Sequence, residues 1–191
     1  PGSAFPSRSQ RLPIAGSPRG GTGFHQQGTP KLPPNQQPVT LARVVTPGYF
    51  RTLRIPVRHG REFTDADTAS AGFVVNEAFA KAYFPGVDPV GVEMSVAMQR
   101  ENPYIRIIGV VGDVSEVSVR QSAQPTVFYN ETTMGEFAMT VMVRTNQPDA
   151  TVAPAIAAVR RIDPNLPVTN VRMFDAALTD TLARERLNAL V

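Results

Sequence analysis

The sequence predicts an α+β domain, and three patterns support this fold class. Short runs rich in β-branched residues predict several strands, and residues 105–114 give the strongest of these patterns. Asp149 is predicted to cap a helix, and apolar residues at helical spacing after it predict one apolar face; this stripe consists of Val152, Ala155, Ile156, Val159 and Ile162. The helix lies between two strand patterns within residues 139–173, and this order suits a sheet with helices on one face.

Residues 1–38 are predicted to form an irregular arm before the folded domain. Residues 1–40 contain 8 of the 18 prolines and 6 of the 14 glycines, so they bury too little apolar surface to offset the entropy of ordering them. They carry four bases and no acid, whereas residues 41–191 carry 15 bases and 16 acids, a net charge of −1 (15 − 16). Because the bases of the arm stand singly, we predict no nucleic-acid partner.

Residues 39–63 are predicted to form a strand, a short helix and an extended segment. Loose alternation with β-branched side chains predicts the strand over residues 39–45. Thr46 and Pro47 favour a helix start, because threonine caps free backbone N–H groups and proline lacks the donor that would stay unpaired there. The extended segment that follows the helix is predicted to turn at His59.

The acidic motif over residues 64–67 has two interpretations. Asp65 and Asp67 have the Asp-x-Asp spacing of some metal and sugar-nucleotide sites. Alternatively, Thr64 and Asp67 form a capping box, in which each side chain bonds to the backbone N–H of the other residue. No glycine-rich phosphate loop lies nearby in the sequence, so we favour the capping box.

The remaining helices and strands follow from the same kinds of pattern. Residues 73–75 are typical of a buried strand, and Asn76 is a good cap for a helix over residues 77–84. The strand predicted at residues 92–98 pairs through a polar loop with residues 105–114, whose glycines indicate a bulge. Further strands are predicted at residues 126–129, 139–144 and 168–173, and a last helix from Asp175.

The residue content and motifs argue against an enzyme. The 191 residues contain no cysteine, which removes disulfides, thiolate catalysis and cysteine-based zinc sites from this chain. The two histidines, His25 and His59, lie in the predicted arm and the predicted turn, away from any recognisable nucleophile pattern. No phosphate loop, Gly-x-Ser-x-Gly elbow or His-Glu-x-x-His pattern is present. We therefore predict no catalytic residue, no cofactor and no metal site.

Six sequence motifs occur in an order that points to one family. They are Val45-Thr46-Pro47-Gly48-Tyr49-Phe50-Arg51-Thr52-Leu53, Gly60-Arg61-Glu62-Phe63-Thr64, Val75-Asn76-Glu77-Ala78, Tyr83-Phe84-Pro85-Gly86-Val87-Asp88-Pro89-Val90-Gly91, Ile108-Gly109-Val110-Val111-Gly112-Asp113-Val114 and Asp163-Pro164-Asn165-Leu166-Pro167-Val168. Together they resemble the MacB-like periplasmic core domain, in the version found in duplicated, FtsX-like ABC-transporter permeases of acidobacterial type.

The resemblance implies a domain of residues 39–191 on the periplasmic side of a bacterial inner membrane. It implies a β-α-β core subdomain, about residues 39–53 and 126–191, with a smaller β-rich subdomain, about residues 54–125, inserted into it. Both ends of the chain look cut from a longer protein, and the apolar residues 187–191 would lead into the next membrane helix.

The resemblance also implies a non-catalytic role in transport. In such permeases the domain couples movement of the membrane helices to periplasmic events or export. The implied partners are a cytoplasmic ABC ATPase subunit and a second periplasmic domain of the same or a partner permease, and the membrane is reached through flanking helices outside this chain. The alternative is a periplasmic peptide or small-molecule binding module, because exposed strand edges could accept a partner strand.

Overall fold

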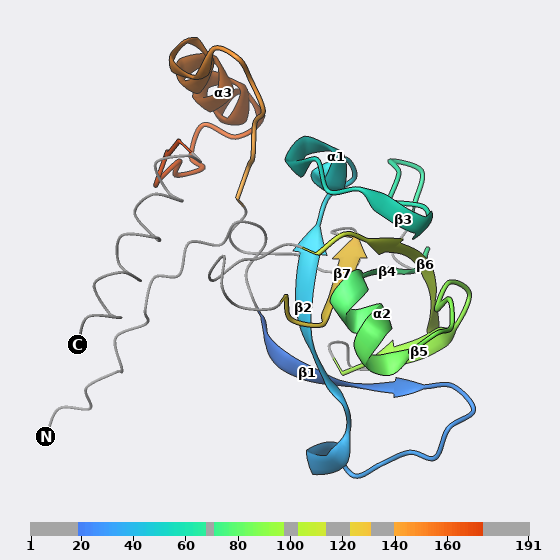
Figure 1. Ribbon diagram of the computed structural model, residues 1–191. Helices are drawn as coiled ribbons and strands as arrows, with labels where there is room; N and C mark the ends of the chain where they lie inside the picture. Colours follow the sequence, from blue (N-terminus) through green and yellow to red (C-terminus); the bar gives the residue numbers. More distant parts are fainter. Residues whose placement is uncertain (1–18, 68–70, 98–102, 114–122, 131–139, 174–191) are drawn as a thin grey trace, which may run out of the picture.

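The computed structural model describes residues 19–67, 71–97, 103–113, 123–130 and 140–173 (Figure 1). The strands are β1 (Arg19–Gln26), β2 (Val39–Val45), β3 (Val57–Gly60), β4 (Phe73–Asn76), β5 (Glu93–Val96), β6 (Ile105–Val111) and β7 (Thr126–Asn130). The helices are α1 (Tyr49–Leu53), α2 (Glu77–Tyr83) and α3 (Pro148–Ile162), and a short 3-10 helix, η1 (Pro34–Gln36), precedes β2.

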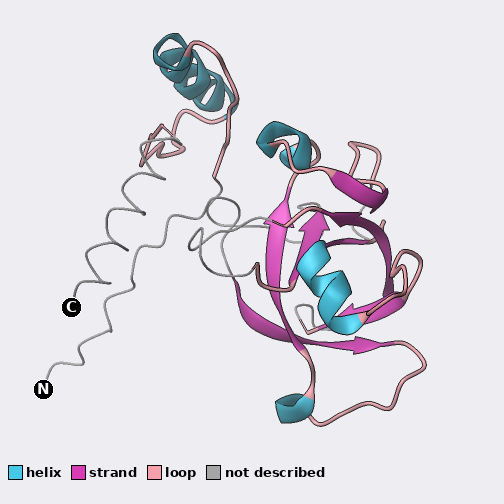
Figure 2. Cartoon of the chain, in the orientation of Figure 1, coloured by secondary structure: helices cyan, strands magenta, loops and turns pink. Residues whose placement is uncertain are grey.

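The strands of the described residues form one mixed sheet in the order β3-β6-β4-β7-β2-β1-β5. The pairs β2–β7 and β4–β6 are parallel, and the other neighbours are antiparallel. β5 also pairs with β6, where Glu93 lies opposite Arg106. All strands except β3 therefore close into a ring, which Figure 2 shows as a curled sheet with α2 beside it.

Strands β4 and β7 are buried on both faces of the sheet, since all their residues are buried and successive side chains of a strand point to opposite sides. Phe73 and Val75 of β4 belong to a first core cluster, whereas Val74 belongs to a second. α2 covers the first cluster through Phe79, and α1 covers the second through Phe50. The structure thus confirms the buried type of strand that was predicted for residues 73–75.

Most elements lie close to their predicted positions, but the starts of α1 and α3 differ. α1 begins at Tyr49 and has Gly48 as its N-cap, instead of beginning at Pro47 with Thr46 as the cap, as the sequence predicts. Asn76 caps α2 as predicted, since its Oδ1 atom accepts a hydrogen bond from the backbone nitrogen of Phe79 at 3.0 Å. α3 has Gln147 as its N-cap instead of the predicted Asp149, because Pro148 fits the first helical position. None of the helices in the described ranges is long and apolar enough to cross a membrane.

Strand β1 contradicts the prediction that residues 1–38 are irregular, because it pairs with both β2 and β5. Phe24 of β1 is 4% exposed, and its ring centroid lies 4.7 Å from that of Tyr83. The glycines that suggested an arm permit this packing: a Cβ atom at Gly21 would lie 2.6 Å from Val39 Cγ1. Glycine here marks a close approach of two strands rather than a loop. The first 18 residues of the predicted arm lie outside the described residues.

Two strands predicted near the C-terminal end are not formed. Residues 140–144 and 168–173 contain no strand, and neither segment pairs with a strand of the described chain. β-branched residues favour a strand only where a neighbour supplies hydrogen bonds and side-chain packing. The predicted β-α-β unit is therefore wrong in its strands and right in its helix, α3. Met139 and the last helix predicted from Asp175 lie outside the described residues.

The turn that the sequence predicts at His59 is not formed. His59 and Gly60 belong to strand β3 instead and pair with β6. Gly60 has φ = +66°, and a Cβ atom there would lie 2.2 Å from the carbonyl oxygen of Ile108. The register of β6 against β4 shifts between Ile107 and Gly109, which confirms the predicted bulge. The close approach of β3 and β6 thus explains both Gly60 and Gly109, because a Cβ atom at either position would collide with the backbone of the other segment.

Strands from the predicted core subdomain and from the predicted insert share one sheet. β2 and β7, which the sequence assigns to the core, pair with each other. β4, assigned to the insert, pairs directly with β7. Both hydrophobic clusters combine side chains from the two parts. The boundary at residue 54 therefore coincides with no break in the sheet, and the division into two subdomains stays a prediction.

Candidate functional site

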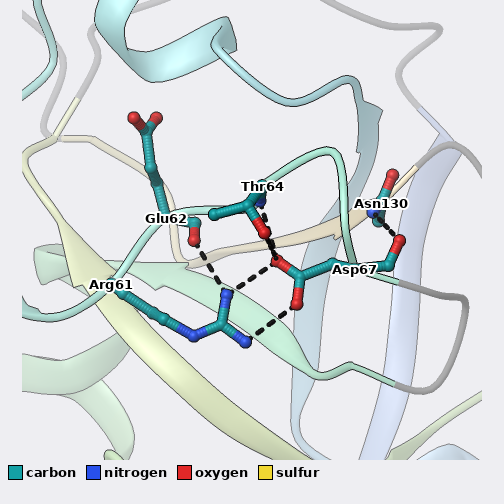
Figure 3. A network of polar contacts seen from close by, with 5 residues as sticks. All are labelled: Arg61, Glu62, Thr64, Asp67 and Asn130. Carbon is teal, nitrogen blue, oxygen red and sulfur yellow. Dashed lines mark hydrogen bonds and ion pairs between the residues drawn. The ribbon is translucent and has the colours of Figure 1, made fainter.

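The acidic motif lies in the loop after β3, where Asp67 is the centre of a polar network (Figure 3). Its carboxylate accepts two hydrogen bonds from the Arg61 guanidinium, at 2.7 and 2.9 Å. It also accepts hydrogen bonds from the backbone nitrogen of Thr64, at 2.7 Å, and from the Thr64 hydroxyl, at 3.0 Å. Arg61 donates to the carbonyl oxygen of Glu62, and Asn130 of β7 donates to that of Asp67.

This network engages the Asp67 carboxylate and leaves it unsuited to a metal or sugar-nucleotide site. The hydrogen bonds from Arg61, followed by those from Thr64, lower the pKa of Asp67 to about 2, although burial opposes this shift. The reach of Asp67 back to the backbone of Thr64 confirms half of the predicted capping box. The Thr64 hydroxyl donates to the carboxylate instead of accepting from the backbone, and a turn rather than a helix follows in the described residues.

The two histidines lie in different strands and form polar cross-links. His25 of β1 has its Nδ1 atom 2.8 Å from the Tyr104 hydroxyl and its Nε2 atom 3.0 Å from the carbonyl oxygen of Thr29. The carbonyl requires a donor, which assigns the proton to Nε2. His59 of β3 has its Nδ1 atom 3.3 Å from an Asp88 carboxylate oxygen at the surface. Across the described ranges, no three histidine, aspartate or glutamate side chains stand close enough to hold a metal ion.

Arg43 is a buried charge that the sequence analysis did not single out. It lies in β2, is 3% exposed and stands near Tyr49 of α1. Burial lowers the pKa of Arg43, and burial raises the pKa of Tyr49 to about 12 although the arginine opposes this. An arginine within a run of β-branched residues is the only sequence signal of this site. Arg43 is therefore a charged group beside α1, next to Tyr49 of the second core cluster.

A groove lies between the β1–β2 loop and the end of α2. It has a volume of about 310 Å³, and its lining includes Phe24, Pro30, Leu32, Tyr83 and Phe84. Gln26 also lines it, and no hydrogen bond to the side-chain amide of Gln26 is found in the described part of the chain. An apolar groove with one available amide suits a small neutral ligand or a peptide side chain.

A packed contact joins the segment before α3 to α1. The side chain of Met142 packs against the second core cluster, which contains Tyr49 and Phe50 of α1. Nearby, Arg144 donates a hydrogen bond from Nε to the carbonyl oxygen of Thr52. Residues 140–144 form no strand, yet these two contacts attach them to the helix that follows β2.

The comparison that decides the family covers most of the chain. A sequence model of the MacB-like periplasmic core domain matches residues 10–162. The chain belongs to this family. The match begins before β1, so the MacB-like domain includes the strand that the sequence analysis placed in an irregular arm. It also confirms the resemblance drawn from the six motifs, and it assigns the chain to the domains of ABC-transporter permeases.

One solved structure supports the same fold at low sequence identity, and two others are similar at lower TM-scores. The extracellular domain of the noncanonic ABC-type transporter YknZ, from Gram-positive bacteria, is 15% identical with a TM-score of 0.53, over 82% of this chain and 79% of that one. The periplasmic region of MacB from Actinobacillus actinomycetemcomitans is 14% identical with a TM-score of 0.45, over 82% and 81%. A domain of a putative permease from Porphyromonas gingivalis is 12% identical with a TM-score of 0.46, over 85% and 78%. No curated protein has a significant sequence match.

Proposed function

We propose that this MacB-like domain is a non-catalytic, extracytoplasmic part of an ABC-transporter permease that couples movement of the membrane helices to periplasmic events or export. Family membership is the observation that carries the proposal. The YknZ domain, which shares the fold, is likewise the extracellular part of an ABC-type transporter. No catalytic residue enters the proposal, because the ionisable groups of the described network hold loops together.

The contacts around α1 support a path for this coupling. β2 leads directly into α1, and Phe50 of α1 is 1% exposed. Met142 packs on the same cluster, Arg144 bonds to Thr52 of α1, and α3 begins at Pro148. We infer that a movement at α3 passes along residues 145–147 to Met142 and Arg144, whose contacts join this segment to α1 and the second core cluster.

The proposal includes the partners and the location that the family implies. The domain stands on the periplasmic side of a bacterial inner membrane, and flanking helices outside this chain anchor it. The partners are a cytoplasmic ABC ATPase subunit and a second periplasmic domain of the same or a partner permease. No nucleic acid is involved, since the chain beyond residue 40 is nearly neutral.

Loss of the Arg144 contact in the whole permease tests the coupling role. Arg144→Ala removes the hydrogen bond to Thr52 without touching the ring of strands. We expect transport to fall severalfold while ATP hydrolysis continues. Arg106→Ala is the matched control, because Arg106 is also exposed and its side chain pairs with Glu93 on the sheet, away from α1. Equal transport by the wild type and Arg144→Ala would count against the proposed path.

The groove at the β1–β2 loop favours a second candidate, a peptide or small-molecule binding module. The aromatic and proline side chains that line the groove offer apolar contact, and the Gln26 amide offers two N–H donors and one carbonyl acceptor. Binding would raise the melting temperature of the chain in a saturable way.

A thermal-shift series with short apolar peptides and apolar small molecules tests this candidate. Gln26→Ala should abolish any saturable shift, whereas Gln27→Ala, the exposed neighbour outside the groove, should preserve it. Flat melting across the whole panel would remove the candidate.

A further inference from the structure

Exposed apolar side chains concentrate at the C-terminal end of the described chain. Of the twelve large hydrophobic side chains that are exposed in the described residues, five lie within residues 162–173: Ile162, Leu166, Val168, Val171 and Met173. Ile162 is 84% exposed, the highest value among the twelve. Single exposed apolar residues are ordinary on a protein surface, but a concentration of them indicates an interaction site.

Three arginines accompany these apolar residues. Arg160, Arg161 and Arg172 are exposed, and Asp163 is the one acid among residues 160–173, so the net charge of this segment is +2 (3 − 1). Within the described part of the chain, none of the three arginines forms an ion pair. By contrast, four arginines around the sheet lie 2.7–3.8 Å from a carboxylate oxygen; they are Arg51, Arg58, Arg61 and Arg106.

A purely structural role explains only part of this arrangement. Arg160 and Arg161 lie in the last turn of α3, where positive charge stabilises the negative end of the helix dipole. They also line an open hollow of about 500 Å³ beside Ala153 and Ile156 of the same helix. The dipole accounts neither for Arg172, which lies beyond the helix, nor for the exposed apolar side chains between the arginines.

We propose that residues 160–173, here called the basic apolar segment, dock on the surface of an anionic lipid bilayer. Arginine side chains bind lipid phosphates, while neighbouring apolar side chains enter the boundary between headgroups and acyl chains. An acidic protein surface would match the arginines, but it would cover the neighbouring apolar side chains only where it also carried an apolar patch. A second copy of the segment would bring two charges of +2 together, which opposes self-association.

Docking on a bilayer is independent of the proposed coupling role. Docking requires only the side chains of the basic apolar segment and a bilayer, whereas coupling requires the contact between Arg144 and Thr52. Vesicle binding by the 191-residue chain therefore tests docking without any transport measurement.

The test is co-sedimentation with vesicles of phosphatidylcholine, with or without phosphatidylglycerol. We expect binding to the anionic vesicles, weak binding to pure phosphatidylcholine, and loss of binding as ionic strength rises. Arg160→Gln with Arg161→Gln should weaken binding about 25-fold, since each base near an anionic surface contributes about fivefold. Ile162→Ser with Val171→Thr should also weaken binding, because the inserted apolar area is reduced.

Matched controls separate the segment from general electrostatics. Lys31→Gln with Lys81→Gln removes the same charge from two exposed lysines elsewhere, and Val87→Thr changes an apolar side chain that is 64% exposed. Both controls should bind like the wild type, and thermal melting should show every variant folded. Equal loss in the lysine control, no binding to either vesicle, or dimerisation that Ile162→Ser abolishes would each overturn the proposal.

Discussion

Asn76 holds strand β7 in place, because its Oδ1 atom accepts a hydrogen bond from the backbone nitrogen of Thr126 at 2.9 Å. The same oxygen accepts from the backbone nitrogen of Phe79 in α2, and the Nδ2 atom donates to the carbonyl oxygen of Gln124. Asn76 is 3% exposed, so water cannot replace these bonds. One buried amide therefore joins β4, α2 and the start of β7.

Asn76→Ala should destabilise the chain strongly. It removes the cap of α2 and leaves the backbone nitrogen of Thr126 buried without this acceptor, which together cost about 2–4 kcal/mol. The free energy of unfolding in urea measures the loss. Asn165→Ala is the control, because Asn165 is exposed and, among the described residues, only its backbone nitrogen is bonded. A loss for Asn76→Ala no larger than that of the control would contradict the role of the amide.

Asp67 should make stability depend on pH in the acid range. Its folded pKa of about 2 lies below the ordinary value of 3.8, so its stabilisation is present above pH 3.8 and is lost as the pH falls towards 2. Because the Arg61 side chain is 49% exposed, solvent screening limits the effect to about 1 kcal/mol. The difference in unfolding free energy between wild type and Asp67→Asn, measured in urea across this range, should shrink with falling pH. A constant difference would contradict the assignment.

Gly60→Ala should cost more than an ordinary glycine replacement in the left-handed region. The new Cβ atom would lie 2.2 Å from the carbonyl oxygen of Ile108, in addition to the strain of a positive φ, which alone costs about 1–2 kcal/mol. Gly86→Ala is the matched control, since Gly86 also has a positive φ but no atom within 4 Å of the added Cβ. Chemical denaturation measures the free energy of unfolding of both variants, and the difference between their losses is the cost of the steric clash at Gly60. Equal losses would mean that β3 and β6 lie further apart than the structure places them.

Phe24→Ala tests whether β1 belongs to the folded core. Phe24 is 4% exposed and packs against Phe79 and Tyr83, so truncation should cost about 3–5 kcal/mol. Leu32→Ala, in the loop after β1, should cost little because Leu32 is 43% exposed. Urea unfolding compares the two variants. A small loss for Phe24→Ala would restore the irregular arm that the sequence analysis predicts.

Local patterns predicted the elements whose stability depends on their own residues. The apolar stripe predicted α3, and Asn76 predicted the start of α2, because helix spacing and capping are encoded within a few residues. The second and third bonds of Asn76 could not be predicted, since Gln124 and Thr126 reach it only through the fold.

Strand predictions failed where a distant neighbour decides the outcome. β1 was missed because Gly21 suggested a loop, whereas its missing side chain admits Val39 of β2. Residues 140–144 have strand-like side chains but no partner strand in the described chain. For the candidate site, the sequence identified the reach of Asp67 to Thr64, but Arg61 and the buried Arg43 became evident only in the structure.

The most direct test of the coupling role is a Gly-Gly insertion between Arg184 and Glu185 in the whole permease, in the stretch expected to lead to the membrane helix. Two glycines loosen a connection through which movement must pass. The same insertion after Gly28 is the control, because that position lies in an exposed loop with a positive φ. Transport and ATP hydrolysis are measured together. The coupling role predicts lost transport with ATP hydrolysis largely intact for the insertion after Arg184 alone, and normal transport in that variant would contradict it.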